Sequence, residues 1–155
     1  MTPPTTSPAS LDNLTLQWLL HQGCDPIDLE QPGPNGDTAL LQATRAGELA
    51  VVQALIQAGV DLNARNYDRN NALWFACFRD RHDLIELLVG AGIDLNNQNV
   101  NGATALMYAA SAGKTAIVQT LLAAGADTRL TNLDDFRAID FAANLEILRI
   151  LQHVV

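Results

Sequence analysis

The sequence predicts an all-α repeat protein in which helix–turn–helix units stack on one another. The phrase LIQAGVD at residues 55–61 returns as LVGAGID at 88–94 and as LLAAGAD at 121–127, each time after 33 residues. Within each interval, the apolar residues follow a helical spacing and a glycine ends the run. Such a period is typical of a solenoid, because one helix pair cannot bury its own apolar face and a stack of pairs can.

The register of the repeat is defined by positions that are identical in all three units. These sets are Ala39/Ala72/Ala105, Leu40/Leu73/Leu106, Ala43/Ala76/Ala109, Leu55/Leu88/Leu121, Ala58/Ala91/Ala124, Gly59/Gly92/Gly125, Asp61/Asp94/Asp127 and Asn66/Asn99/Asn132.

The elements follow from this register. Residues 12–22 (DNLTLQWLLHQ) predict an N-terminal helix with Asp12 as its N-cap. In the third unit, Thr104 predicts an N-cap, residues 105–112 a first helix and residues 115–123 a second helix. Gly113 and Gly125 are expected to end these helices, Gly125 in the left-handed conformation. The Asn- and Asp-rich segments between units predict projecting hairpins.

Both ends of the chain are predicted to be capping units. The first hairpin, PIDLEQPGPN, is longer than the others, and after Ile139 the last helix has no second glycine turn. We therefore expect a flexible Pro-rich tail at residues 1–11 and one repeat domain at residues 12–155. The domain would comprise a partial repeat (12–32), three full repeats (33–65, 66–98 and 99–131) and a C-terminal cap (132–155).

Composition and net charge argue against binding to nucleic acids and to anionic membranes. The chain has 155 residues, of which 48% are hydrophobic and 17% charged, and its net charge is −8. Nucleic acids and anionic membranes are poor partners for it, because both need clustered Lys and Arg. The two cysteines form no CxxC pair, and the first ten residues lack the basic and apolar segments of a signal peptide. A cytoplasmic protein is therefore expected.

The repeat resembles a known family. NGATALMYAASAGKTAIVQTLLAAGADT, at residues 101–128, is similar to an ankyrin repeat, and residues 35–63 and 68–96 match in the same register. The resemblance implies an ankyrin-repeat solenoid with projecting hairpin loops. The family's Pro is replaced by Ala in every unit, and its His by Leu41, Trp74, Met107 and Asp140. The middle repeat (residues 66–98) also has Arg69, Asn71 and Asp80 where Gly, Thr and Gly are usual, so it is expected to be the least regular.

Candidate chemical groups do not converge. His21, His82 and His153 lie in different units without metal-ligand spacing, and are expected at the surface. The tripeptide at 113–115 (GKT) lacks the strand and the first glycine of a phosphate-binding loop. Asp134 and Asp135 are expected to be solvated turn residues. No catalytic activity and no cofactor are predicted.

The resemblance implies that partners bind to hairpin tips and to the exposed side of the first helices, which line a concave surface. The middle repeat is rich there in aromatic and Arg side chains, the types that dominate binding hot spots. The candidate partner-binding residues are Tyr67, Arg69, Asn70, Trp74, Phe78, Arg79, Asn101 and Phe136, and Arg45 lies on the same expected face. Phe75 falls at a core position and is expected to pack there. Alternatively to partner contact, Trp74 is a shielded packing residue, and Arg65 and Arg81 only offset nearby Asp residues.

These patterns predict a non-catalytic protein–protein interaction module, acting as an adaptor, inhibitor or assembly factor. Its partner would be another protein, and the free chain would be a monomer. A structural array that associates with itself is one alternative. A small-ligand-binding protein is a weaker one, because it needs a deep pocket with converging polar groups.

Overall fold

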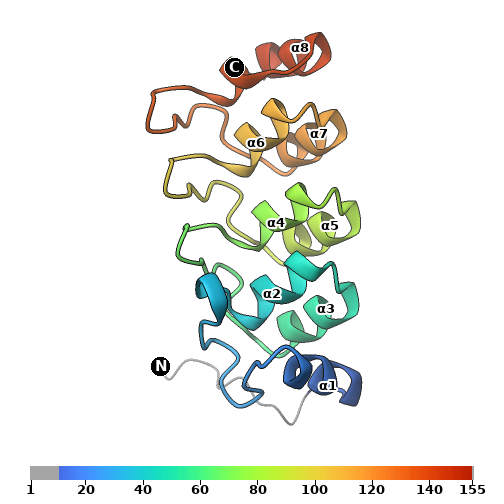
Figure 1. Ribbon diagram of the computed structural model, residues 1–155. Helices are drawn as coiled ribbons and strands as arrows, with labels where there is room; N and C mark the ends of the chain where they lie inside the picture. The colour runs from blue at the N-terminus through green and yellow to red at the C-terminus, as the bar shows by residue number, and fades with distance from the viewer. Residues whose placement is uncertain (1–10, 155) are drawn as a thin grey trace, which may run out of the picture. The chain divides into compact units, whose positions relative to one another are not determined.

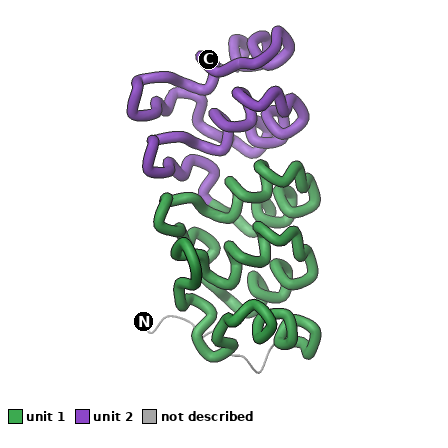
Figure 2. The backbone as a smooth tube through the Cα atoms, in the orientation of Figure 1, with its two compact units in different colours: residues 1–93 green, residues 94–155 purple. Residues whose placement is uncertain are grey.

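The computed structural model describes residues 11–154, and in this range the chain is helical without any strand. The all-α repeat fold predicted from the sequence is confirmed. The chain divides into two compact units, residues 1–93 and 94–155, which Figure 2 colours separately. The predicted tail lies outside the described residues except for Leu11, which is buried.

The first unit holds one N-terminal helix and two helix pairs (Figure 1). Its elements are α1 (Asn13–His21), the 3₁₀ turn η2 (Pro34–Gly36), α2 (Ala39–Ala46), α3 (Leu49–Gln57), α4 (Ala72–Phe78) and α5 (His82–Gly90). The first helices of successive repeats, α2 and α4, pack together, and so do the second helices α3 and α5. Side chains such as Leu40, Leu55, Leu73 and Leu88 are fully buried between the pairs. Each contributes about 2–3 kcal/mol to folding.

The second unit holds one full helix pair and the C-terminal cap. Its elements are α6 (Ala105–Ser111), α7 (Thr115–Ala123), the 3₁₀ turn η3 (Ala138–Phe141) and α8 (Leu145–His153). α6 packs against α7 and η3, and α8 packs against both α7 and η3. The first helix of the last repeat is thus reduced to a short turn, as suits a unit that ends a stack.

The predicted helix caps are present. Asp12 accepts hydrogen bonds from the backbone N–H (2.8 Å) and the hydroxyl (3.0 Å) of Thr15. Thr104 accepts one from the N–H of Met107 at 3.2 Å. Gly125 has φ +99°, in the left-handed region as expected. The predicted first helix of the third repeat was one residue too long, because Ala112 is its C-cap.

The middle repeat has side chains at two left-handed positions where its neighbours have glycine. Gly47 and Gly113 follow the first helices of their repeats with φ +79° and +71°, whereas Asp80 holds the equivalent position at +54°. At the hairpin tip, Arg69 has φ +62° where the repeats on either side have glycine. A side chain in this region costs roughly 1–2 kcal/mol because its Cβ crowds the carbonyl oxygen. The predicted irregularity therefore has an energetic cost.

Candidate functional site

Each of three hairpins is held by one asparagine at the same repeat position. The side-chain oxygen of Asn66 accepts backbone N–H groups of Asp68 (3.1 Å) and Asn70 (3.0 Å). Asn99 and Asn132 make the same pair of bonds, each at 3.0 Å, to the second and fourth residues after them. The Asn that is identical in all three units therefore shapes these hairpin tips.

Buried Asp37 ties two successive hairpins of the first unit to helix α2. Its Oδ1 accepts a hydrogen bond from Nδ2 of Asn66 at 2.9 Å, and its Oδ2 pairs with Nη2 of Arg45 at 2.7 Å. The Asp37 side chain is 5% exposed and that of Arg45 is 46% exposed. Arg45 is thus fixed from its buried side and offers its other side to solvent.

Arg45 forms one wall of a hollow between α2 and the end of α4, which we call the aromatic–arginine pocket. Its lining residues are Arg45, Trp74, Phe75, Phe78 and Arg79, and its volume is about 300 Å³. The guanidinium of Arg45 lies 4.4 Å from the centroid of the Phe75 ring, a cation–π distance. Three of the predicted residues, Trp74, Phe78 and Arg79, therefore come together.

Phe78 and Tyr67 point outward, as predicted. Phe78 is 58% exposed and Tyr67 is 73% exposed. The ring of Tyr67 lies against Gly36, where a Cβ atom would come within 2.6 Å of it. Its backbone N–H also donates to the carbonyl of Asn35 at 3.0 Å. Tyr67 is thus held in place on the preceding hairpin while its ring meets solvent.

Phe75 has two roles. It was expected to pack in the core, and at 8% exposure it is buried. Yet its ring also contacts Arg45 and lines the pocket. Trp74 is half-buried, with its backbone N–H bonded to the capping oxygen of Asn71 at 3.2 Å.

The other predicted residues of the middle repeat lie at its hairpin tip. Arg69 is exposed, and Asn70 is half-buried. Within residues 11–154, the side-chain oxygen of Asn70 is buried and has no hydrogen-bond partner. Neither residue lines the aromatic–arginine pocket.

Arg81 is taken up by structural contacts. It pairs with Asp83 at 2.8 Å and donates to the carbonyl oxygen of Gly47 at 2.7 Å. The hydrogen bond from this guanidinium holds the pKa of the Asp83 carboxyl below its usual range, and the pKa of Arg81 is raised in turn. The alternative that Arg81 only offsets a nearby Asp therefore agrees with the geometry.

The two predicted residues of the second unit lie at its hairpins. Asn101 is exposed, and its carbonyl accepts the N–H of Leu133 at 3.0 Å. Phe136 is 50% exposed and meets Phe141 edge to face, with ring centroids 5.9 Å apart. Leu133, at 75% exposure, adds to this apolar tip.

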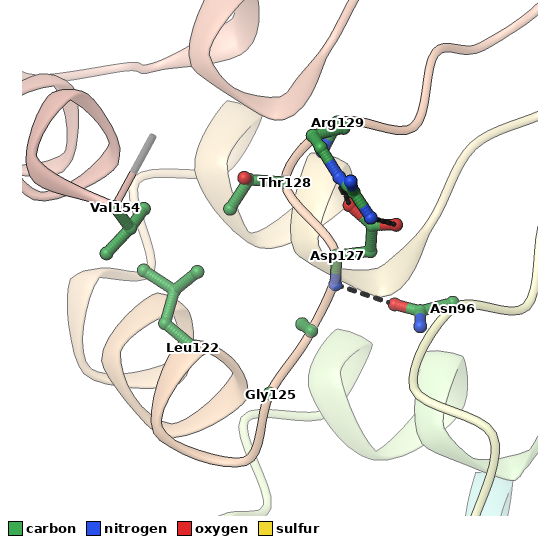
Figure 3. Close-up of a pocket in the computed structure, with 8 residues that line it drawn as sticks. Asn96, Leu122, Gly125, Asp127, Thr128, Arg129 and Val154 are labelled. Atoms are coloured by element: carbon green, nitrogen blue, oxygen red, sulfur yellow. Dashed lines mark hydrogen bonds and ion pairs between the residues drawn. The ribbon is translucent and has the colours of Figure 1, made fainter.

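Sequence reasoning did not predict a hollow of about 500 Å³ near the C-terminal ends of α7 and α8 (Figure 3). Asp127 lines it and is bound on two sides: its backbone N–H donates to Asn96 at 2.8 Å, and its carboxylate pairs with Arg129 at 3.1 Å. The hydrogen bond from Arg129 lowers the pKa of Asp127, so this carboxylate stays charged at neutral pH. It is not poised to act as a general base or acid.

Within residues 11–154, no group of three or more His, Cys, Asp or Glu side chains is placed to hold a metal ion. His21, His82 and His153 are exposed, as predicted, and so are Asp134 and Asp135. Cys24 and Cys77 are free thiols. In the described part of the chain, no helix has the length and apolar character needed to cross a membrane.

Comparison with known proteins gives the same pattern of repeats. A family model described as ankyrin repeats (3 copies) matches residues 9–99 and 81–154. Two curated relatives, the Notch-regulated ankyrin repeat-containing proteins of Homo sapiens and Mus musculus, are each 37% identical over 72 residues. The match takes in 45% of this chain and 62% of each relative, so the chain spans less than two thirds of their length.

Proposed function

Because the chain belongs to the ankyrin repeat family, whose members are in general protein–protein interaction modules, we propose that it binds a partner protein through its middle repeat. The binding surface would comprise the hairpin tip with Tyr67, Arg69 and Asn70, and the aromatic–arginine pocket. In the second unit, taken by itself, Asn101 and Phe136 are the candidate contact residues. Ankyrin proteins bind through their hairpin tips and first helices, which supports the choice of these elements.

One observation carries the proposal. Phe78, Arg45 and Arg79 are exposed around one hollow of the first unit, on a protein whose net charge is −8. Tyr67 is exposed on the hairpin before α4. Tyr67 and Phe78 leave more than half of their surface exposed, and exposed apolar patches mark interaction sites. Trp, Tyr and Arg are also the residues that most often dominate binding energy.

The middle repeat departs from the family pattern where strain results. Arg69 and Asp80 adopt left-handed conformations that glycine would adopt without cost. Strain of this kind concentrates at functional sites, where the side chain is worth more than the stability it costs.

On this proposal the chain is non-catalytic and acts in the cytoplasm as an adaptor, inhibitor or assembly factor. The free thiols of Cys24 and Cys77 agree with a reducing compartment. The alternatives are self-association of the array and binding of a small ligand; the hollow of Figure 3 is the place for the latter. Light scattering of the free chain tests self-association, and a monomeric mass would contradict it.

The test is affinity capture from native lysate with quantitative mass spectrometry. Wild type is compared with the triple variant Tyr67→Ala, Phe78→Ala, Arg79→Ala. The control is Leu14→Ala, Leu20→Ala, which removes exposed apolar groups (78% and 63%) from α1 of the same unit. We expect one protein to be retained by wild type and control and lost by the triple variant. Equal capture by all three would show that the middle repeat is not the binding surface.

A further inference from the structure

The aromatic–arginine pocket combines apolar aromatic surface with positive charge. Trp74, Phe75 and Phe78 supply apolar surface, and Arg45 and Arg79 supply positive charge beside it. Its volume of about 300 Å³ is at the lower limit for small-molecule sites, which are about 300–1,000 Å³. It therefore suits one or two side chains of a partner better than a whole cofactor.

The two arginines of the pocket are not electrically equivalent. Arg45 is paired with Asp37 at 2.7 Å and lies over Phe75, so its charge is largely compensated. Arg81, two residues beyond Arg79, is likewise compensated by Asp83. Among the residues that the structure describes, none forms a hydrogen bond or ion pair with the guanidinium of Arg79. The pocket thus carries one uncompensated cation next to an aromatic surface.

Charge selects among the possible occupants. Aromatic pockets bind cations well, but here the uncompensated charge of Arg79 would repel a lysine or a quaternary ammonium group. A polyanion such as a nucleic acid is opposed by the net charge of −8. One carboxylate satisfies the fork of an arginine with two parallel hydrogen bonds, and its charge is too small to be excluded by the whole chain.

Resting on the proposed function, we infer that the partner presents a short segment in which an aromatic or large aliphatic side chain lies beside an Asp or Glu. The apolar side chain fills the pocket against Phe75 and Phe78. The carboxylate pairs with Arg79. Arg45, held by Asp37, forms the opposite wall and stacks on the inserted group.

The experiment is selection of random 12-residue peptides, displayed on phage, against the immobilised full chain. The enriched peptide is then made with a fluorescent label, and its affinity is measured by polarisation. We expect enriched peptides to contain an aromatic or large aliphatic residue within two positions of Asp or Glu. Arg79→Ala and Phe78→Ala should each weaken binding at least tenfold, whereas Arg65→Ala, an exposed arginine outside the pocket, should change it less than twofold.

A charge reversal sharpens the test. Arg79→Glu should abolish binding of the acidic peptide and restore binding to a peptide with Lys in place of the acid. Enrichment of basic peptides, the absence of any enriched peptide, or unchanged affinity in Arg79→Ala would each overturn the inference. If the affinity capture still lost the partner protein with Tyr67→Ala alone, the proposed function would stand. Failure of the acidic-segment inference can therefore be told apart from failure of the proposed function.

Discussion

Asp37 is the residue whose removal should reveal how the binding face is built. Replacing it by Ala leaves Nδ2 of Asn66, a residue only 5% exposed, without its acceptor at 2.9 Å. An unsatisfied buried amide costs about 1–3 kcal/mol. The lost pair with Arg45 adds about 0.5 kcal/mol, because that side chain is 46% exposed and can rehydrate. We expect the free energy of unfolding to fall by about 1.5–3.5 kcal/mol.

The assay is urea unfolding followed by circular dichroism at 222 nm, with a lower midpoint and an unchanged slope as the expected result. The control is Asp68→Ala, an exposed acid on the next hairpin, which should change stability by less than about 0.5 kcal/mol. A double-mutant cycle with Asn66→Ala should give a coupling of about 1–2 kcal/mol. Additive effects of the two substitutions, or a loss equal to the control's, would refute the role assigned to the network.

Three further outcomes are expected. Arg69→Gly should raise stability by about 0.5–1 kcal/mol, because relief of left-handed strain exceeds the added flexibility of the unfolded chain, and it should weaken partner binding. Asp80→Gly should also raise stability but leave partner binding unchanged. If the two variants bound the partner equally well, a role for the Arg69 side chain would be contradicted. Iodoacetamide followed by mass spectrometry should modify Cys24 slowly, since burial raises the pKa of its thiol, and should modify buried Cys77 only on unfolding. The hydrogen bond from the Thr15 N–H lowers the pKa of Asp12, so the stabilising effect of this carboxylate is present at neutral pH and is lost as the pH falls below about 4. Asp12→Asn keeps a capping side chain, and its melting temperature should therefore fall less with acid than that of wild type. Parallel curves of melting temperature against pH for the two proteins would contradict this role.

The fold could be predicted because the sequence repeats the same pattern of residues at a fixed period. Identical residues at a fixed period define the helix pairs, and single residues such as Asp12 and Thr104 mark helix starts through a local hydrogen bond three residues away. Tyr67 and Phe78 could be placed outward for the same reason, since their positions in the repeat are occupied by exposed groups.

The links between repeats could not be predicted. Asp37 has Asn70, Ala103 and Phe136 at its equivalent positions, so no recurring residue type signals its bond to Asn66. Phe75 was assigned to the core from its register, but its contact with Arg45 depends on how α2 and α4 pack. The reduction of the last first helix to η3 likewise depends on packing at the end of the stack.

The central claim is that the exposed aromatic side of the middle repeat touches a protein partner. Photo-crosslinking tests it most directly, with p-benzoylphenylalanine placed at position 78 or 67 and, as a control, at position 14 on α1, which is also exposed. The chain is irradiated in native lysate, and the crosslinked peptides are identified by mass spectrometry. Crosslinks from positions 78 and 67 to one protein, with none from position 14, are the predicted result. Crosslinks from position 14 alone, or to unrelated proteins from all three positions, would contradict the claim.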